Sequence, residues 1–510
     1  MTTHDATRAV LREGPTVTTL LSRAAHRHGD AVAFIDKDGV LTYRETWRRV
    51  RAIAGMLRAH GVALGDRVAQ LAPNSTNAWC VQAATYILGA RFVGLQIMGS
   101  PESWSMVLED AEPCVFVTDF DGAGELRGVA ATSCKILSRA DICAASSDEP
   151  LGEDTLPDLP ESTIARMAYT GGTTGRPKGV LQSHRVLVTA AIFALGAVAF
   201  PRTPHFFIGA PLTHGAGTMV LPTLIRGGSI HIAETFDPDI FIDAIESGEV
   251  NATWVVPTML YKFIDHPRTR RARIGALELV VYTGAPSSPT RIAEAVDLLG
   301  PVLQQLYGQT EAPQFLTSLR PEDHQHRARL ASVGFPLPGV TVAVLSDDGS
   351  PVPPGQTGEI CVRGQIVADG YWRRPEETKT AQAGCWLHTG DVGYEDETGC
   401  IYLVDRKNDL IITGGFNVYP REVEDALMSH PAVADAVVVG VHDPYWGEAI
   451  AAAVVLRADA TVEADTLIAH VRTQRGKVYA PKSLRFLPAI PATAVGKPDR
   501  KAIRSVFANS

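Results

Sequence analysis

Hydrophobic positions in the first 300 residues alternate between helical spacing and short buried runs. One amphipathic helix is predicted between a capping box at Thr42 and Glu45 and a terminating Gly61, with an apolar face made of Trp47, Val50, Ala54 and Leu57. Two more helices are expected to begin at Pro238 and Pro289. Buried strands are expected at 67–71, 114–118, 229–233, 253–256 and 277–282. Because strands alternate with helices, the sequence predicts largely parallel sheets.

The hydrophobic pattern changes at Ser332. From there to about residue 404, apolar and polar residues alternate between turn signals, which favours an antiparallel, β-barrel-like segment. A βαββα-like pattern follows, with apolar strands expected at 437–441 and 450–456. We therefore predict an α/β protein that has a large N-terminal domain, 1–404, with mostly parallel sheets. A small α+β domain, 405–510, is expected to follow it.

Composition and charge exclude several classes of protein. The chain has 510 residues, 45% hydrophobic and 20% charged, which is typical of a globular protein and not of a disordered or fibrous one. At about 150 residues per domain, this length allows three domains or two large ones. A net charge of −9 excludes a global positive field for nucleic acid or an anionic membrane. The basic run between Arg472 and Arg504 is expected to be a solvated tail.

Several features indicate a cytoplasmic protein. The seven cysteines are scattered and never spaced as C-x-x-C, so we expect reduced thiols, with neither a disulfide framework nor a structural zinc site. Residues 1–15 carry charges and no apolar signal core. The longest apolar stretch, 186–200, is too short to span a bilayer. The sequence leaves the oligomeric state open, including a homo-oligomer.

The stretch from Tyr169 to Gly179, Tyr-Thr-Gly-Gly-Thr-Thr-Gly-Arg-Pro-Lys-Gly, has the composition of a phosphate-binding loop. Its glycines expose backbone N–H groups, its threonines add hydroxyl donors, and Lys178 adds a positive charge. It is not a Walker A loop, because Pro177 precedes the lysine and Gly179 follows it. A surface turn would explain any three of these residues, but the whole ordered stretch favours a polyphosphate site.

Together with later motifs, this loop resembles the ANL superfamily of adenylate-forming enzymes, which includes acyl-CoA and aryl-CoA ligases, peptide-synthetase adenylation domains and luciferases. The matching segments follow the family's order over nearly the whole chain: Pro211-Leu212-Thr213-His214-Gly215, Gly284-Ala285-Pro286, Tyr307-Gly308-Gln309-Thr310-Glu311, Trp386-Leu387-His388-Thr389-Gly390-Asp391, Asp405-Arg406-Lys407-Asn408-Asp409, Gly414-Gly415-Phe416-Asn417-Val418-Tyr419-Pro420 and Gly496-Lys497. The resemblance implies that the C-terminal domain is mobile, with a hinge at 405–409 on Asn408 or Asp409.

The resemblance implies an AMP-forming acid–thiol ligase with two half-reactions. A carboxylate attacks the α-phosphorus of ATP, with Mg²⁺ present, to give an acyl-adenylate and pyrophosphate; the thiol of coenzyme A then displaces AMP. The first step brings an anion to a polyphosphate, so cations and oriented dipoles must stabilise the charge that develops. The expected partners are a bulky acyl or aryl carboxylic acid, ATP or AMP, and CoA.

The resemblance also implies roles for the matched residues. The β- and γ-phosphates would be held by Thr170, Gly172, Thr173, Thr174, Gly175 and Lys178. The remaining nucleotide positions would be Gly284, Ala285, Tyr307, Gly308, Gln309, Asp391 and Arg406. Thr310 would contact the α-phosphate, Glu311 would bind Mg²⁺, and Lys497 would be the catalytic lysine of adenylation.

Three further features concern the acyl group and the thiol. Gly414 and Gly415 would let the pantetheine arm approach the backbone closely. His214 would line the acyl site and the thiol entrance, with a satisfied core histidine as the equal alternative. Acetate-specific relatives have Trp at the position of Gly308, so glycine is expected to leave the pocket open for a bulky acid.

Two departures from the family's pattern leave other functions open. Gly171 stands where relatives usually have Ser or Thr, and Phe416 stands where many ligases have Glu, so either residue could weaken adenylation. An enzyme that makes thioesters from a supplied adenylate is therefore an alternative, as are a carrier-protein-loading enzyme and a luciferase-like oxygenase. The non-enzyme alternative is a nucleotide-binding scaffold, against which four charged residues argue together: Lys178, Glu311, Asp391 and Lys497.

Overall fold

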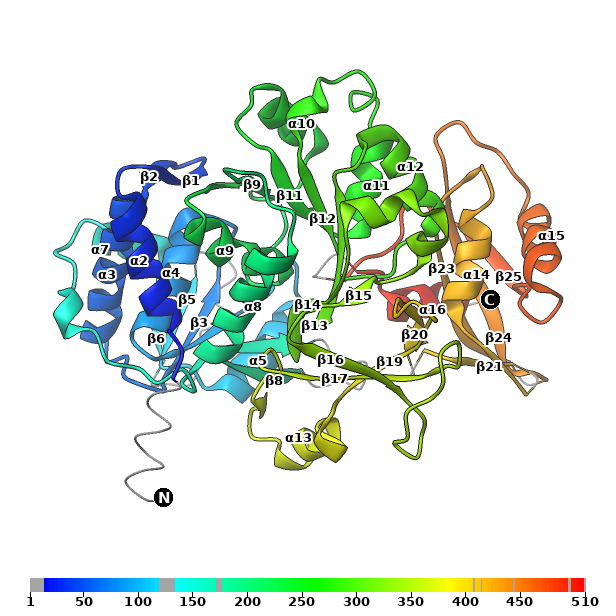
Figure 1. Cartoon of the computed structure of the whole chain (residues 1–510). Helices are drawn as coiled ribbons and strands as arrows, with labels where there is room; N and C mark the ends of the chain where they lie inside the picture. Colours follow the sequence, from blue (N-terminus) through cyan, green and yellow to red (C-terminus); the bar gives the residue numbers. More distant parts are fainter. Residues whose placement is uncertain are drawn as a thin grey trace.

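The computed structural model describes residues 13–118, 134–170, 177–406, 409–413, 415–443, 445–493 and 497–508. Two large mixed sheets with helices and a smaller antiparallel sheet form most of the chain, and a further sheet carries the C-terminal part (Figure 1). The α/β architecture predicted from the hydrophobic pattern is thus confirmed.

The first large sheet has nine strands in the order β15-β14-β13-β12-β11-β9-β10-β1-β2. Pairing is parallel from β1 to β13 across the centre and antiparallel where β2, β14 and β15 complete the edges. The strands are β1 Val32–Asp36, β2 Gly39–Thr42, β9 His205–Ile208, β10 Ser229–Ile232, β11 Ala252–Val255, β12 Leu279–Tyr282, β13 Leu303–Gln309, β14 Ala312–Leu319 and β15 Phe335–Pro336. Strands β10, β11 and β12 fall on the three apolar runs expected in this region.

The second large sheet has seven strands in the order β18-β8-β7-β4-β3-β5-β6. Its centre is parallel, and β7, β8 and β18 pair in antiparallel fashion at one edge. The strands are β3 Arg67–Leu71, β4 Arg91–Gly94, β5 Val115–Thr118, β6 Lys135–Leu137, β7 Ile164–Thr170, β8 Lys178–Ser183 and β18 Gly370–Tyr371. The parallel centre follows from the helices that connect successive strands.

Helices cover both large sheets (Figure 1). The main ones are α2 Val17–His28, α3 Tyr43–Ala59, α4 Thr76–Ile87, α5 Pro101–Ala111, α7 Arg139–Ala145, α8 His184–Ala197, α9 Val220–Ile225, α10 Pro238–Glu246, α11 Pro257–Asp265, α12 Pro289–Leu299 and α13 Pro375–Ala381. The capping box of α3 is confirmed, since Thr42 Oγ1 accepts from the Glu45 N–H and the Glu45 carboxylate accepts from the Thr42 N–H.

Helix α8 explains the long apolar stretch at 186–200. It contacts β14 of the first large sheet and β8 of the second, so apolar residues on several of its faces are buried. A helix that is apolar over most of its circumference is suited to this position inside a protein. Among the described residues, no helix has the length and apolarity needed to cross a membrane.

A third sheet and a fourth follow in the chain. The segment expected to resemble a β-barrel forms β16 Val340–Leu345, β17 Gly358–Gly364, β19 Leu387–Glu395 and β20 Ile401–Arg406, all antiparallel and paired in the order β16-β17-β19-β20. The fourth sheet pairs β22-β21-β24-β23, with β25 on β24. Its region contains β21 Ile411–Thr413, β22 Phe416–Val418, α14 Pro420–Met428, β23 Val433–Asp443, β24 Gly447–Leu456, α15 Ala464–Arg475, β25 Ser483–Phe486 and α16 Arg500–Ala508.

The sequence interval proposed as a hinge lies where the chain passes from one sheet to another. β20 ends at Arg406 in the third sheet, and β21 begins at Ile411 in the fourth. Lys407 and Asn408 lie outside the described residues. The region after this point has an apolar core of its own, which includes Val438 and Ile450.

The basic run between Arg472 and Arg504 is not a tail, although most of its cations are exposed to solvent as expected. The run forms part of α15, β25 and α16. Arg500 Nη1 lies 2.9 Å from Glu424 Oε1, and its Nε lies 3.8 Å from Asp409 Oδ2. Glu424 is buried, so its carboxylate requires a cation, and Arg500 supplies it.

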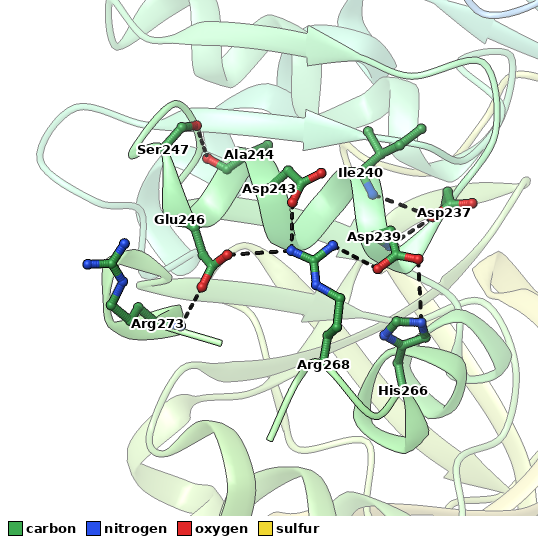
Figure 2. A network of polar contacts seen from close by, with 10 residues as sticks. All are labelled: Asp237, Asp239, Ile240, Asp243, Ala244, Glu246, Ser247, His266, Arg268 and Arg273. Carbon is green, nitrogen blue, oxygen red and sulfur yellow. Dashed lines mark hydrogen bonds and ion pairs between the residues drawn. The ribbon is translucent and has the colours of Figure 1, made fainter. Parts of the chain in front are cut away.

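A surface network fixes the connection between α11 and β12. Figure 2 shows Arg268 reaching back to α10, where its guanidinium lies 2.8 Å from Asp239 Oδ1 and 2.6 Å from Asp243 Oδ1. Glu246 at the end of the same helix accepts a hydrogen bond from the Arg273 N–H at 3.0 Å. These contacts hold a polar connection against α10, and solvent screening limits their contribution to stability.

Candidate active site

The glycine- and threonine-rich loop connects two strands. Thr170, the last residue of β7, pairs with Lys178, the first residue of β8. This strand–loop–strand setting agrees with the inference that the loop is not a Walker A motif, which would enter a helix. The loop positions Gly171, Gly172, Thr173, Thr174 and Gly175 lie outside the described residues, so their role stays a prediction.

Lys178 and Glu311 share a neighbour. The Lys178 ammonium forms an ion pair with Glu377 at 2.5 Å and lies 5.5 Å from the centre of the Tyr371 ring. The Tyr371 hydroxyl donates to Glu311 Oε1 at 2.8 Å. Strand β18, which carries Tyr371, thus brings the lysine after the loop and the candidate magnesium carboxylate to one place.

Tyr307, Asp391 and Arg406 form a contact chain. The Tyr307 hydroxyl donates to Asp391 Oδ2 at 2.6 Å, and Arg406 Nε lies 3.2 Å from Asp391 Oδ1. Asp391 and Arg406 face each other in the pairing of β19 with β20. Burial, followed by the Asp391 charge, holds the pKa of the Tyr307 phenol well above its usual value, so Tyr307 remains a neutral donor.

Lys497 lies near this chain, although it comes from the far end of the sequence. Its carbonyl accepts a hydrogen bond from the Thr493 N–H at 2.7 Å. The pKa of the Lys497 ammonium is lowered to about 8, mainly by burial and then by the Arg406 charge, while Asp391 and Glu311 act in the opposite direction. All three charges act on the lysine, which places its ammonium within electrostatic range of them.

His214 lies within electrostatic range of Lys497. Gln96 Nε2 donates to its Nδ1 at 2.8 Å, so the assigned tautomer carries its hydrogen on Nε2. Burial lowers the pKa of the imidazole to about 3, and the positive charges of Arg166 and Lys497 add to the shift. The ring is therefore neutral at physiological pH and can donate a hydrogen bond from Nε2.

The hairpin of β13 and β14 carries the Tyr-Gly-Gln-Thr-Glu motif. A Cβ on Gly308 would lie 2.6 Å from the Gln314 Cα and backbone N, so the backbone itself requires glycine here. The side-chain Nε2 of Gln309 is buried and has no hydrogen-bond partner among the described residues. A buried amide donor without a partner is costly unless a ligand satisfies it, which fits a nucleotide site at this turn. Thr310 and Glu311 follow in the same turn and are partly exposed.

An apolar wall lies beside His214. Trp254 Nε1 donates to Gln314 Oε1 at 3.0 Å, and both side chains are buried. Gln314 has a positive φ of 54°, a conformation that costs energy for a residue other than glycine and is common in binding sites. A Cβ on Gly215 would lie 2.1 Å from the Gln314 amide, so only glycine leaves room here for the Gln314 side chain. Gly284, with a φ of 91°, passes near the same tryptophan, and Ala285 follows it.

The candidate pantetheine glycines belong to a different sheet. Gly415 is exposed in the turn between β21 and β22, and a Cβ there would meet no atom within 4 Å. Gly414 lies outside the described residues. Phe416, which stands where many ligases have Glu, is 58% exposed on the same hairpin. No contact given for the described residues joins this hairpin to Lys497 or Asp391.

Sequence reasoning missed three residues of the site. Tyr371 joins Lys178 to Glu311, Gln96 orients His214, and Arg166 places a buried cation beside the imidazole. A signal existed only for Arg166, since it interrupts the apolar run of β7. A buried arginine is costly, so one inside an apolar strand suggests a site. Tyr371 and Gln96 lie in segments that give no local hint of function.

The residues present fit a magnesium ion. Glu311 offers carboxylate oxygens beside the Thr310 hydroxyl, which are the kind of ligands that Mg²⁺ prefers when phosphate oxygens and water complete its shell. A single protein carboxylate is enough for such a shared site.

We expect Gly308→Ala to destabilise the protein by about 1–3 kcal/mol, because the added methyl group forces the β13–β14 backbones apart. Chemical denaturation would measure the change. Gly275→Ala is the matched control, since a Cβ there meets nothing within 4 Å. Equal stability of the two variants would contradict the close approach at Gly308.

Comparison with known proteins gives one consistent family. The family model "AMP-binding enzyme" matches residues 21–372, and "AMP-binding enzyme C-terminal domain" matches residues 422–497. A medium/long-chain-fatty-acid–CoA ligase, FadD8, of Mycobacterium tuberculosis is 37% identical, covering 96% of this chain and 89% of its own. A feruloyl-CoA synthase of Amycolatopsis sp is also 37% identical, covering 95% and 98%. Among solved structures, the amide bond synthetase McbA of Marinactinospora thermotolerans superimposes with a TM-score of 0.87 at 34% identity, covering 96% of this chain and 100% of its own.

The chain therefore belongs to the AMP-binding enzymes, in the group of adenylate-forming acyl-CoA and aryl-CoA ligases.

Proposed function

We propose that this chain activates a bulky acyl or aryl carboxylic acid as an acyl-adenylate with ATP and transfers the acyl group to CoA. The proximity of Lys497 to Asp391, Arg406 and Glu311 is the observation that carries the proposal. These groups come from two separate sheets and the C-terminal end of the chain. Two cations and two carboxylates gathered in a partly buried place, with a perturbed lysine pKa, are typical of a functional site.

Each charged group has a role in the first half-reaction. The Asp391 carboxylate accepts hydrogen bonds from the ribose hydroxyls, as it accepts one from Tyr307 here. A magnesium ion held by Glu311 would supply charge neutralisation at the phosphates. Lys178 adds a cation at the phosphate loop. The Lys497 ammonium lies between the incoming carboxylate and the α-phosphate and stabilises the charge that develops as pyrophosphate leaves.

His214 and the apolar wall position the acid. Because the imidazole is neutral, it donates from Nε2 without adding a charge that would compete with Lys497. Trp254 and Gln314 form the wall against which the acyl group packs. An aromatic wall with one polar contact suits a large acyl or aryl group.

The test is AMP formation from ATP with a panel of carboxylic acids, measured separately with three acceptors. CoA should be the best acceptor. Preference for a phosphopantetheinyl carrier protein would identify a carrier-protein-loading enzyme. Preference for an amine would identify an amide-forming enzyme, which is the chemistry named for McbA. Acid-dependent pyrophosphate exchange tests adenylation alone. Robust exchange would reject the alternative of an enzyme that only forms thioesters from a supplied adenylate. Absence of AMP formation with every acid would support the non-enzyme alternative, a nucleotide-binding scaffold.

Lys497→Ala should lower acid-dependent pyrophosphate exchange by ~10²–10³-fold, because one aligned cation is lost from the transition state. Thioester formation from a supplied acyl-adenylate should be retained. Lys501→Ala, which removes an exposed lysine of α16, is the control and should change neither rate. Equal loss of both half-reactions in the Lys497 variant would count against its assignment to adenylation.

Adenylation should also fall at alkaline pH. The pKa of Lys497 is lowered to about 8, so the required ammonium form is lost as pH rises through that value. Kcat/KM for ATP reports the free enzyme and should show the decrease. In Lys497→Arg the guanidinium stays charged, so any remaining activity should lack this alkaline limb. An identical limb in both enzymes would assign it to another group.

The second part of the proposal is that the region 405–510 reorients between the half-reactions about residues 405–409. Two arginines connect this region to the N-terminal part. Arg457 lies 2.5 Å and 3.3 Å from the two carboxylate oxygens of Glu294 on α12, and Arg421 donates to the Ser287 carbonyl at 3.3 Å. Glu294 also pairs with the fully buried Arg291. These contacts stabilise the arrangement that holds Lys497 near Asp391.

Arg457→Ala should therefore slow adenylation a few-fold while thioester formation from supplied adenylate stays equal or rises, because only the adenylation arrangement loses a contact. Both partners are about one-third exposed, so we expect a modest effect. Arg475→Ala is a matched control, because Arg475 pairs with Glu422 within the C-terminal region. Parallel changes in both half-reactions for Arg457→Ala would argue against a contact specific to one arrangement.

A further inference from the structure

Three side chains with metal-binding atoms meet on β17 and β19, outside the groups assigned to the nucleotide and the acid. Glu359 and Cys361 are two apart on β17 and therefore share a face, and His388 lies opposite Cys361 in the register of β19. His388 Nδ1 lies 3.4 Å from Cys361 Sγ and 3.1 Å from Glu359 Oε2. All three donor atoms lie within 4.8 Å of one another.

These separations fit a tetrahedral ion. Zinc bonds of ~2.3 Å to sulfur and ~2.0 Å to nitrogen and oxygen place neighbouring ligand atoms roughly 3.3–3.6 Å apart at tetrahedral angles. The two measured separations at His388 Nδ1 are close to that range without movement of either strand. A thiolate, an imidazole and a carboxylate are also ligands that zinc accepts together.

The surroundings suit a bound ion. Cys361 is fully buried, whereas the side chains of His388 and Glu359 are 29% and 17% exposed, which leaves a side for metal entry and a water ligand. Glu359 Oε1 accepts from the Gly390 N–H at 3.0 Å, so the second carboxylate oxygen is already oriented by the backbone. Contacts of this kind to outer oxygens raise the affinity of metal sites.

We propose that Glu359, Cys361 and His388 bind one Zn²⁺ ion, with water as the fourth ligand. Binding breaks the Cys361 S–H bond, releases that proton to solvent and forms the S–Zn bond, while His388 binds through unprotonated Nδ1. The ion would join β17 to β19 directly before Gly390 and Asp391. It would therefore rigidify the part of β19 in which Thr389 Oγ1 donates to the Ile360 carbonyl at 2.6 Å.

The experiment uses the full chain without a histidine tag, stripped with chelator and titrated with Zn²⁺ by calorimetry. One Zn²⁺ per chain is expected, with a rise in the thermal midpoint and no displacement by excess Mg²⁺. Co²⁺ should give a sulfur-to-metal charge-transfer band. Cys361→Ser and His388→Gln should each weaken binding at least ~10- to 100-fold, the range found when supporting groups of metal sites are removed. Cys361→Ser should also abolish the band, because it removes the sulfur ligand.

Cys385→Ser, an exposed thiol outside the cluster, is the matched control and should bind as the unaltered chain does. If Cys361→Ser fails to fold, Glu359→Gln keeps the side-chain shape and should still weaken binding. No stoichiometric Zn²⁺, or equal affinity in the Cys361, His388 and Glu359 variants, would overturn the proposal and leave the three side chains as a hydrogen-bonded cluster. Because zinc binding needs no acid or CoA, this outcome is independent of the proposed ligase activity.

Discussion

The central constraint in this molecule is the placement of a lysine ammonium beside an arginine in a partly desolvated site. Lys497 and Arg406 repel each other, and among the described residues Asp391 and Glu311 act on both cations in the opposite direction. The arrangement holds because each group is fixed by a different part of the fold: Asp391 by β19, Arg406 by β20 and Glu311 by the β13–β14 hairpin. A polyanionic ligand would convert an unfavourable pair of cations into a binding site.

Local chemistry made much of the fold predictable. The capping box at Thr42 and the Pro-initiated helices depend on neighbours within four residues, and they occur where expected. The buried strands β3, β10, β11 and β12 followed from short, mostly apolar runs. Most of the basic C-terminal run is solvated as expected, but Arg500 pairs with Glu424, which is far away in sequence. No local pattern tells a solvated arginine from a paired one.

Residues of the candidate site were predictable only where they lie within a single sequence motif. Tyr307 and Asp391 were selected separately, and the structure adds their hydrogen bond. Gly308 was explained by pocket space, whereas the structure adds a close backbone approach to Gln314 that already requires glycine. Tyr371 was missed because its contact with Glu311 joins segments 60 residues apart. Cysteine spacing excluded zinc along the chain, but Cys361 and His388 meet across two strands, where spacing carries no information.

The pairing of Asp391 with Arg406 connects two properties that would otherwise be independent. Asp391 contacts Tyr307 on one side, and Arg406 on the other side is the last residue of its strand before the chain crosses to the fourth sheet. A ligand that moves either side chain would weaken the ion pair at the end of the β19–β20 pairing. A change in the contacts of Tyr307 or Asp391 therefore acts directly on the last residue of β20 before the chain enters the fourth sheet.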